Sequence, residues 1–309
     1  MAASGIVFVG GRFVPADQAA VSVFDHGLLY GDGVFEGIRA YNGRVFKLSR
    51  HIERLFDSAH AIRLSIPVSP AEMINLVLET CRLNEIVDGY IRLVVTRGAG
   101  ALGIDPRSCA RADVVVIAQP KMSMYAHEPG TGVKLVTASL RRIPPDALSP
   151  SIKSLNYLNN VLARIEANDR GADEALMLDR DGYVAEATAD NVFLGTERGL
   201  VTPPTSTNLR GITRETVLEI AADLGVPAVE QRFTLYDVWT AREAFMCGTG
   251  AEIVPIASVD GRVIGTGAPG PITSRVVSAY DRLVRSTGTP IPRTAGSWPV
   301  ASTPVAQAS

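Results

Sequence analysis

The sequence lacks the features that mark membrane, secreted and nucleic-acid-binding proteins. No apolar stretch approaches the roughly 20 residues that a membrane helix requires. Residues 1–5 show neither the basic nor the apolar region of a signal peptide. Charged residues make up only 20% of the 309 and the formal net charge is −2, without a basic run that alternates with aromatics. The sequence therefore predicts no membrane and no nucleic-acid partner.

Cysteine and histidine are also scarce. The three cysteines are an odd, scattered set, which favours reduced core thiols in the cytoplasm over disulfides. The four histidines show no metal-ligand spacing with cysteine or with one another. We therefore expect no metal site.

The length indicates two domains, and the order of elements favours an α+β fold because strands and helices alternate without a strict βαβ pattern. We expect a small N-terminal domain at 1–119, a linker at 120–132 that holds Pro129-Gly130, and a large domain at 133–285. Residues 286–309 are rich in Ser, Thr, Pro and Ala, which predicts a disordered tail.

Local signals place the elements. A hairpin is expected at 6–14, and a second at 35–48 around Asn42-Gly43, a pair typical of a type I′ turn. Ser49 and Ser69-Pro70 each favour the start of a helix. The remaining segments are strands at 90–96, 113–119, 133–139, 174–178, 183–187, 191–194, 200–202 and 243–247, and helices at 153–169, 212–224 and 271–285.

The run at 98–103 matches a dinucleotide-binding fingerprint in its spacing. That fingerprint needs a helix directly after it, to hold the pyrophosphate at its N-terminus. Ile104-Asp105-Pro106 follows instead, and the next strand begins near Asp113. The segment is therefore predicted to be a loop bordering a pocket, and a nicotinamide enzyme is the weaker interpretation.

Lys153 lies between small and apolar neighbours, with Tyr157 four positions on. If a helix opens here, the two side chains share one face. A lysine in an apolar setting loses its proton easily, and the neutral amine forms Schiff bases with aldehydes. A surface lysine at the start of a helix is the alternative interpretation of the same segment.

Other segments carry weaker signals. Glu186 lies between strands, where it is either a solvated carboxylate or a partner for a protonated ring nitrogen. Gly211 precedes a helix whose first N–H groups can bind an anion. Gly248-Thr249-Gly250 offers a hydroxyl between glycines, and Arg54 lies opposite the apolar stripe of its helix. Each segment alone favours a structural role.

Taken together and in order, these segments resemble the class IV (fold type IV) aminotransferases, which use pyridoxal 5′-phosphate (PLP), and most nearly the branched-chain amino acid aminotransferases. The resemblance runs from about Gly5 to Arg285. It includes the segments 30–39, 51–55, 90–92, 211–214 and 248–252, together with those around Lys153 and Glu186. For the fold it implies a small α/β domain and a larger domain with a pseudo-barrel of strands and flanking helices.

The resemblance also implies residue roles. Lys153 would hold the cofactor aldehyde as a Schiff base and move the proton, Glu186 would pair with the pyridine nitrogen, and Tyr157 with the phenolic oxygen. The remaining cofactor residues would be Leu209 on the ring face, and Arg54, Gly211, Ile212, Thr213 and Thr249 at the phosphate. The substrate residues would be Tyr30 from the neighbouring subunit, Phe35, Gly37, Tyr90, Arg92, Thr249 and Gly250.

The implied reaction moves the amino group of L-leucine, L-isoleucine or L-valine to 2-oxoglutarate by a ping-pong mechanism, in a cytoplasmic homodimer or higher homo-oligomer. The partners would be amino acids and 2-oxo acids. D-amino acid aminotransferase, (R)-amine aminotransferase and aminodeoxychorismate lyase are alternatives on the same scaffold. Tyr90-Ile91-Arg92 favours the branched-chain group, because residues two apart on a strand share a face.

Overall fold

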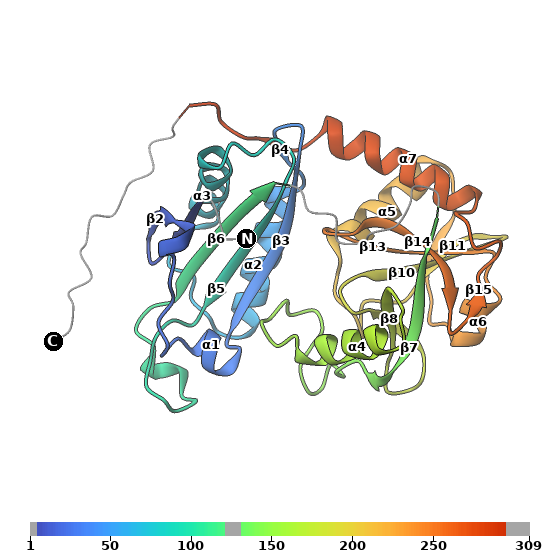
Figure 1. The fold of residues 1–309 in the computed structure, drawn as a ribbon, viewed down its shortest axis with the longest axis horizontal. Coiled ribbons are helices and arrows are strands. Elements are labelled where there is room, and N and C mark those ends of the chain that lie inside the picture. The colour runs from blue at the N-terminus through green and yellow to red at the C-terminus, as the bar shows by residue number, and fades with distance from the viewer. Residues whose placement is uncertain (1–4, 121–130, 295–309) are drawn as a thin grey trace. The chain divides into compact units, whose positions relative to one another are not determined.

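The computed structural model describes residues 5–120 and 131–294. The chain divides into two compact units, one of residues 1–121 with 288–309 and the other of residues 122–287. In Figure 1 the first unit runs from blue to green, with its residues 288–294 in red, and the second unit runs from light green to red. The predicted linker at 120–132 lies largely outside the described residues.

The first unit contains an antiparallel seven-stranded sheet in the order β16-β4-β3-β5-β6-β1-β2. Its strands are β1 (Ile6–Val9), β2 (Arg12–Pro15), β3 (Gly33–Tyr41), β4 (Arg44–Val45), β5 (Gly89–Thr96), β6 (Asp113–Pro120) and β16 (Thr289–Pro290). Both predicted hairpins are confirmed, and Asn42 and Gly43 have the positive φ values that their turn requires.

Helices cover one face of this sheet. These helices are α2 (Leu48–Ala61) and α3 (Pro70–Leu83), and the unit also contains the short helix α1 (His26–Tyr30) and 3₁₀ turns at Ala16–Gln18 and Pro106–Ser108. In Figure 1, α2 and α3 lie behind the sheet, in agreement with the packing of α2 on β3 and of α3 on β5 and β6. Ile91 and Leu93 of β5 point into the core between them. By alternation, Tyr90 and Arg92 point to the opposite face.

Two expectations in this unit need correction. Ser49 does not cap α2: the N-cap is Lys47, whose left-handed backbone turns the chain directly from β4 into the helix. The disordered tail does not begin at 286, because Thr289 and Pro290 pair with β4. The predicted start of α3 is confirmed, with a capping box between Ser69 and Glu72.

The second unit contains a mixed nine-stranded sheet in the order β12-β11-β10-β13-β14-β7-β8-β9, with β15 beside β14. Its strands are β7 (Val133–Arg141), β8 (Glu174–Leu178), β9 (Val184–Ala187), β10 (Asn191–Thr196), β11 (Gly199–Thr202), β12 (Ala228–Glu230), β13 (Glu243–Gly248), β14 (Glu252–Val259) and β15 (Arg262–Val263). Only residues 188–190 join β9 to β10, although these strands lie far apart in the sheet order. The sheet therefore curls to bring them together, as the pseudo-barrel prediction requires.

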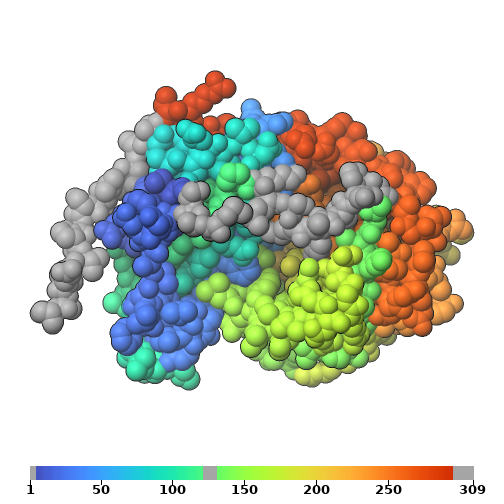
Figure 2. All heavy atoms as spheres, viewed as in Figure 1, coloured from blue at the N-terminus to red at the C-terminus, as the bar shows by residue number. Residues whose placement is uncertain are grey.

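Four helices pack around this sheet: α4 (Leu158–Asp169), α5 (Ile212–Asp223), α6 (Leu235–Trp239) and α7 (Pro271–Ser286). Small side chains allow α4 to approach β7 and β8 closely, since Ala163 and Ala167 meet Ala138 and Ala175. The helices α5 and α7 pack on each other and on β13. Figure 2 shows α4, in yellow-green, at the surface of this unit.

Candidate functional site

Lys153 lies in an irregular segment, not in a helix. The expectation that a helix opens at this residue is wrong, because α4 begins only at Leu158 and Tyr157 is its N-cap. Short backbone hydrogen bonds bend the preceding segment, for example from the Tyr157 N–H to the Leu155 carbonyl. The bend still brings the predicted pair together: Lys153 Nζ lies 3.3 Å from the Tyr157 hydroxyl.

Glu186 is a buried carboxylate on β9, only 4% exposed. Arg142 Nε donates to its Oε1 at 2.6 Å, and the Leu209 N–H donates to its Oε2 at 3.1 Å. Two donors from different segments thus fix the carboxylate in one orientation. The alternative interpretation, a solvated carboxylate, is wrong. Arg142 was not a candidate from the sequence, because Arg141-Arg142 at the end of a strand resembles an exposed basic pair.

The segment that precedes α5 is attached to the Glu186 region. Asn208 Nδ2 donates to the Ala185 carbonyl at 3.0 Å, and Asn191 Nδ2 donates to the Leu209 carbonyl at 3.1 Å. Gly211 is required here, since a Cβ at this position would lie 2.0 Å from Asn191 Oδ1. Within the described residues, no side chain caps the N-terminus of α5. Its first N–H groups, at Ile212 and Thr213, are the kind of donors that bind an anion.

Thr249 and Gly250 lie in the turn between β13 and β14. The preceding Gly248 packs so closely on Asp190 that a Cβ would lie 2.0 Å from Oδ1. Asp190 adjoins Asn191, which meets Gly211. The structure thus places both predicted anion-binding segments against two adjacent residues, Asp190 and Asn191 at the start of β10.

The first unit brings four predicted substrate residues together on the sheet face that α2 and α3 do not cover. Arg92 Nη2 donates to the Tyr90 hydroxyl at 2.9 Å, and its guanidinium lies 4.8 Å from the ring centroid of Phe35. Gly37 pairs with Arg92 in the β3–β5 ladder, and a Cβ on Gly37 would lie 2.2 Å from the Tyr90 hydroxyl oxygen. The prediction that Tyr90 and Arg92 share a face is confirmed.

Arg54 belongs to a different cluster, on the helix-covered side. Its Nε and Nη2 donate to the two carboxylate oxygens of Glu36, each at 2.7 Å, and His51 Nδ1 lies 2.8 Å from Glu36 Oε2. Burial acts to raise the pKa of Glu36, but the charges and hydrogen bonds of Arg54 and His51 lower it to about 2. Glu36 and His51 lie in segments 30–39 and 51–55, which contribute to the family resemblance, but neither residue had a predicted role.

Tyr30 lies on α1, and its contacts are with the loop at 98–103 and with His26 of the same helix. Its hydroxyl donates to the Leu102 carbonyl, and its ring packs edge-on against His26. His26 in turn lies 2.8 Å from the Ala101 carbonyl oxygen through Nε2. These contacts hold the loop at 98–103 against α1. A 3₁₀ turn and strand β6 follow this loop, so the nicotinamide interpretation has no helix to support it.

Among residues 5–120 and 131–294, no group of His, Cys, Asp and Glu side chains is arranged to hold a metal ion. Over the same described ranges, no helix combines the length and apolar character needed to cross a membrane. The cysteines Cys81, Cys109 and Cys247 are free.

The chain belongs to the class IV amino-transferase family, whose model matches residues 33–259. It is 51% identical over 275 residues to a Methanocaldococcus jannaschii protein that is provisionally named a branched-chain-amino-acid aminotransferase. The match covers 89% of this chain and 94% of the relative. It is 40% identical over 287 residues to the Pseudomonas aeruginosa branched-chain-amino-acid aminotransferase, covering 91% and 93%.

The fold matches solved structures of the same kind. The branched-chain aminotransferase of the archaeon Thermoproteus uzoniensis, solved with norvaline, has a TM-score of 0.86 and 40% identity, over 92% of this chain and 95% of that chain. The Thermobaculum terrenum branched-chain amino acid aminotransferase, solved in its PLP form, has a TM-score of 0.83 and 32% identity, over 92% and 95%. The fold type predicted from the sequence is confirmed.

Proposed function

We propose that this chain is a PLP-dependent transaminase that moves the amino group of L-leucine, L-isoleucine or L-valine to 2-oxoglutarate. The observation that carries the proposal is the setting of Glu186, a buried carboxylate held by Arg142 and by the backbone of Leu209. The same unit contains the Lys153 amine beside a phenol. The names of the similar proteins support the substrate class.

The residues of the second unit fit PLP. In the described part of the chain the N–H donors of the α5 N-terminus have no side-chain cap, and Gly211 packs closely on Asn191, which suits a helix start that binds a phosphate. We assign the phosphate to Arg54, Gly211, Ile212, Thr213 and Thr249, the ring face to Leu209, and the aldehyde to Lys153. When bound, the cofactor supplies an electron sink for the charge that develops at the substrate Cα.

The side chains of the chain then have distinct tasks. Lys153 Nζ would move the proton between the substrate Cα and the C4′ atom of the cofactor. Glu186 would accept a hydrogen bond from the protonated ring nitrogen, and its fixed orientation means that the carboxylate would not have to reorganise during the reaction. The Tyr157 hydroxyl, which lies 3.3 Å from Lys153 Nζ, would hydrogen-bond the phenolic oxygen of the cofactor.

One substrate pocket has to accept both an apolar and an acidic side chain. Phe35 and Gly37 supply an apolar lining, and Arg92 supplies a cation that already lies over the Phe35 ring. Such an arginine can turn between the aromatic face and a carboxylate, because guanidinium stacks on rings and pairs with anions. We assign the α-carboxylate of the substrate to Tyr90, Thr249 and Gly250. This division supports 2-oxoglutarate as the proposed acceptor.

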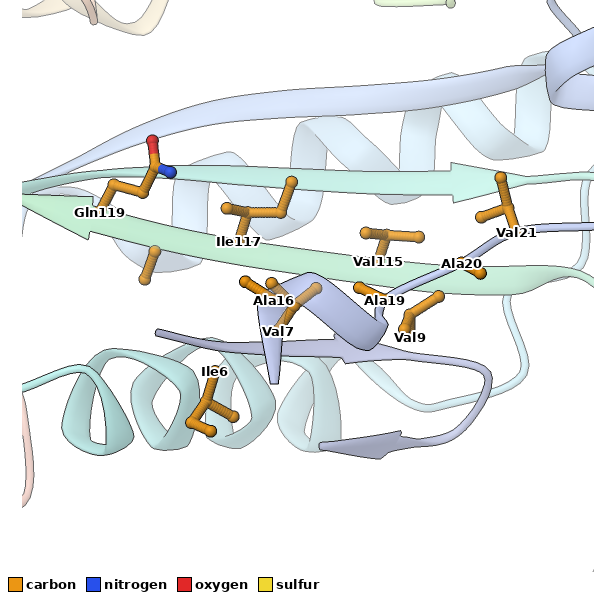
Figure 3. A pocket seen from close by; sticks show the side chains of 11 residues that line it. Ile6, Val7, Val9, Ala16, Ala19, Ala20, Val21, Val115, Ile117 and Gln119 are labelled. Carbon is orange, nitrogen blue, oxygen red and sulfur yellow. The ribbon is translucent and has the colours of Figure 1, made fainter. Parts of the chain in front are cut away.

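We further propose a homodimer in which Tyr30 completes the neighbour's site. Large apolar side chains are exposed on α1, on the segment before it and on the loop that it contacts: Val21, Val23, Phe24, Leu28, Leu29, Leu102 and Ile104. An apolar pocket of about 280 Å³ adjoins them between β1, β6 and residues 16–21 (Figure 3). Monomers rarely expose apolar patches of this kind. The free thiols support a cytoplasmic location.

The proposal is tested by the colour and chemistry of the PLP-loaded protein. We expect L-leucine, L-isoleucine and L-valine to change the absorbance of the bound cofactor, and borohydride to fix the cofactor on Lys153, as peptide mapping would show. Lys153→Ala should lose turnover by at least about 10⁴-fold, because the covalent catalyst is gone. A response to D-alanine alone, to (R)-amines alone, or release of pyruvate from aminodeoxychorismate would transfer the assignment to one of the alternative enzymes.

The assembly is tested separately. Leu28→Arg places a charge in the exposed apolar patch and should shift the protein from dimer to monomer in light scattering, with loss of activity. An active monomer would contradict the role of Tyr30.

A further inference from the structure

Glu36 is the most deeply buried member of a charged cluster in the first unit. Its side chain is 0% exposed, and it accepts from Nε and Nη2 of Arg54 and faces Nδ1 of His51, at 2.7, 2.7 and 2.8 Å. It comes from β3, whereas Arg54 and His51 come from successive turns of α2. The cluster therefore joins the sheet to the helix that covers it.

Packing alone does not account for a carboxylate at this position. By strand alternation Glu36 lies on the same face as Val34 and Ile38, which are core residues. An apolar residue would fill this site without desolvating a charge, and buried ion pairs are often no more stabilising than apolar replacements. The pKa of Glu36, lowered to about 2 by its partners, shows that the carboxylate is ionised across the physiological range.

We propose that Glu36 is a positioning residue that fixes Arg54 for a phosphate group, with His51 as its second support. The proposal rests on the function proposed above, in which Arg54 binds the phosphate of PLP. Glu36 itself touches neither cofactor nor substrate in this assignment. It acts through the arginine.

Geometry and exposure support this division of roles. Arg54 is 13% exposed at its side chain, so within this ion pair only the arginine presents surface to a ligand. A bidentate pair fixes the plane of the guanidinium as well as its position. An arginine fixed in this way loses little side-chain freedom when the phosphate arrives, which strengthens binding through pre-organisation.

The test compares two ligands that differ only in the phosphate, PLP and pyridoxal, by titration of the apoprotein. Glu36→Gln should raise the Kd for PLP by about 10- to 100-fold, the range typical when a supporting residue of a ligand is lost. The Kd for pyridoxal should change by less than about 3-fold, because pyridoxal has no phosphate to contact Arg54. Unchanged or tighter binding of PLP, or equal weakening for both ligands, would overturn the proposal.

Glu79→Gln is the matched control. Glu79 forms a bidentate pair with Arg82 in the same unit, at 2.6 and 2.7 Å, and has no assigned role. We expect it to leave both Kd values unchanged. If Glu36→Gln does not fold, Glu36→Asp retains the charge but withdraws it from Arg54, and should weaken PLP selectively.

A third variant separates this proposal from the function on which it rests. If Arg54→Met weakens PLP selectively and Glu36→Gln does not, the positioning role fails and the role of Arg54 stands. If Arg54→Met binds both ligands as the wild type does, the phosphate assignment of Arg54 itself is wrong.

Discussion

Each unit contains a buried carboxylate paired with an arginine, and the two pairs are used in opposite ways. In the first unit Arg54 is the proposed ligand for the cofactor and Glu36 supports it, with exposures of 13% and 0%. In the second unit Glu186 is the proposed ligand and Arg142 supports it, with side-chain exposures of 6% and 8%. An ion pair therefore does not reveal which member meets the ligand. The difference lies in the other contacts.

Those contacts differ in kind. The carboxylate of Glu36 has a second partner in His51, so its partners among the described side chains come from α2. Glu186 has a backbone partner in Leu209, within the segment that leads to the α5 N-terminus. The first carboxylate is thus enclosed by its own domain core, whereas the second is connected to a predicted ligand-binding segment.

The strongest test of this comparison is Glu186→Gln. We expect the single-turnover rate with L-leucine to fall by about 10²- to 10³-fold, because a preorganised charge at the ring is lost. Glu174→Gln is the control, since Glu174 is also buried and paired with an arginine, Arg164, but has no proposed ligand. Equal losses in both variants would mean that Glu186 serves structure only.

Replacing Arg142, which supports Glu186, should lower the free energy of unfolding. Arg142→Gln leaves Glu186 buried without its charged partner, which should lower the free energy of unfolding by about 3–5 kcal/mol. Denaturant titration of the apoprotein measures this. Arg142→Lys should recover part of the loss, because the charge returns without the Nε donor. Stability equal to that of the wild type in Arg142→Gln would show that the backbone of Leu209 suffices.

We expect acid to weaken the stabilisation that the ion pair between Glu36 and Arg54 provides. Its pKa is lowered from 4.5 to about 2, so the stabilisation is complete above pH 4.5 and is lost as the pH falls towards 2. The contribution is about 3 kcal/mol, since each pKa unit corresponds to about 1.4 kcal/mol. The slope of unfolding free energy between pH 4.5 and 2 should therefore be smaller in Glu36→Gln than in Glu79→Gln. An unchanged slope would contradict the ionised pair.

The smallest expected effect is that of Tyr157→Phe. Loss of one hydrogen bond near Lys153 corresponds to about 1 kcal/mol, or roughly a 5- to 10-fold fall in turnover. The absorbance of the bound cofactor should also shift, because the hydroxyl is proposed to contact the ring oxygen. If turnover falls as far as in Glu186→Gln, Tyr157 takes part in proton transfer.

Much of the local structure could be predicted. Asn42-Gly43 and Ser69-Pro70 act through their own backbone preferences, so both the turn and the helix start are confirmed. The prediction for the Lys153 segment was wrong, because spacing that is compatible with a helix does not reveal that the helix starts only five residues later, at Leu158. Strand β14 was not predicted; it contains Pro255, and proline argues against a strand with neighbours on both sides.

The candidate site, too, could be predicted from the sequence only in part. Tyr90 and Arg92 could be paired from strand periodicity alone, and the structure confirms that they meet. Arg142 could not be found, since nothing near it in the sequence distinguishes a buried arginine from an exposed one. Its contact with Glu186 depends on the pairing of β8 with β9, which places Glu186 within reach of the arginine.

The sequence by itself determined the chemical groups and the local elements that carry them, because turns, caps and strand alternation depend on a few neighbouring residues. The tertiary structure alone decided which groups are partners: Glu36 meets Arg54 across 18 positions and Arg142 meets Glu186 across 44. The physical reason is that a charge enters the interior only where the fold supplies its counter-charge, and that supply depends on which strands and helices pack together.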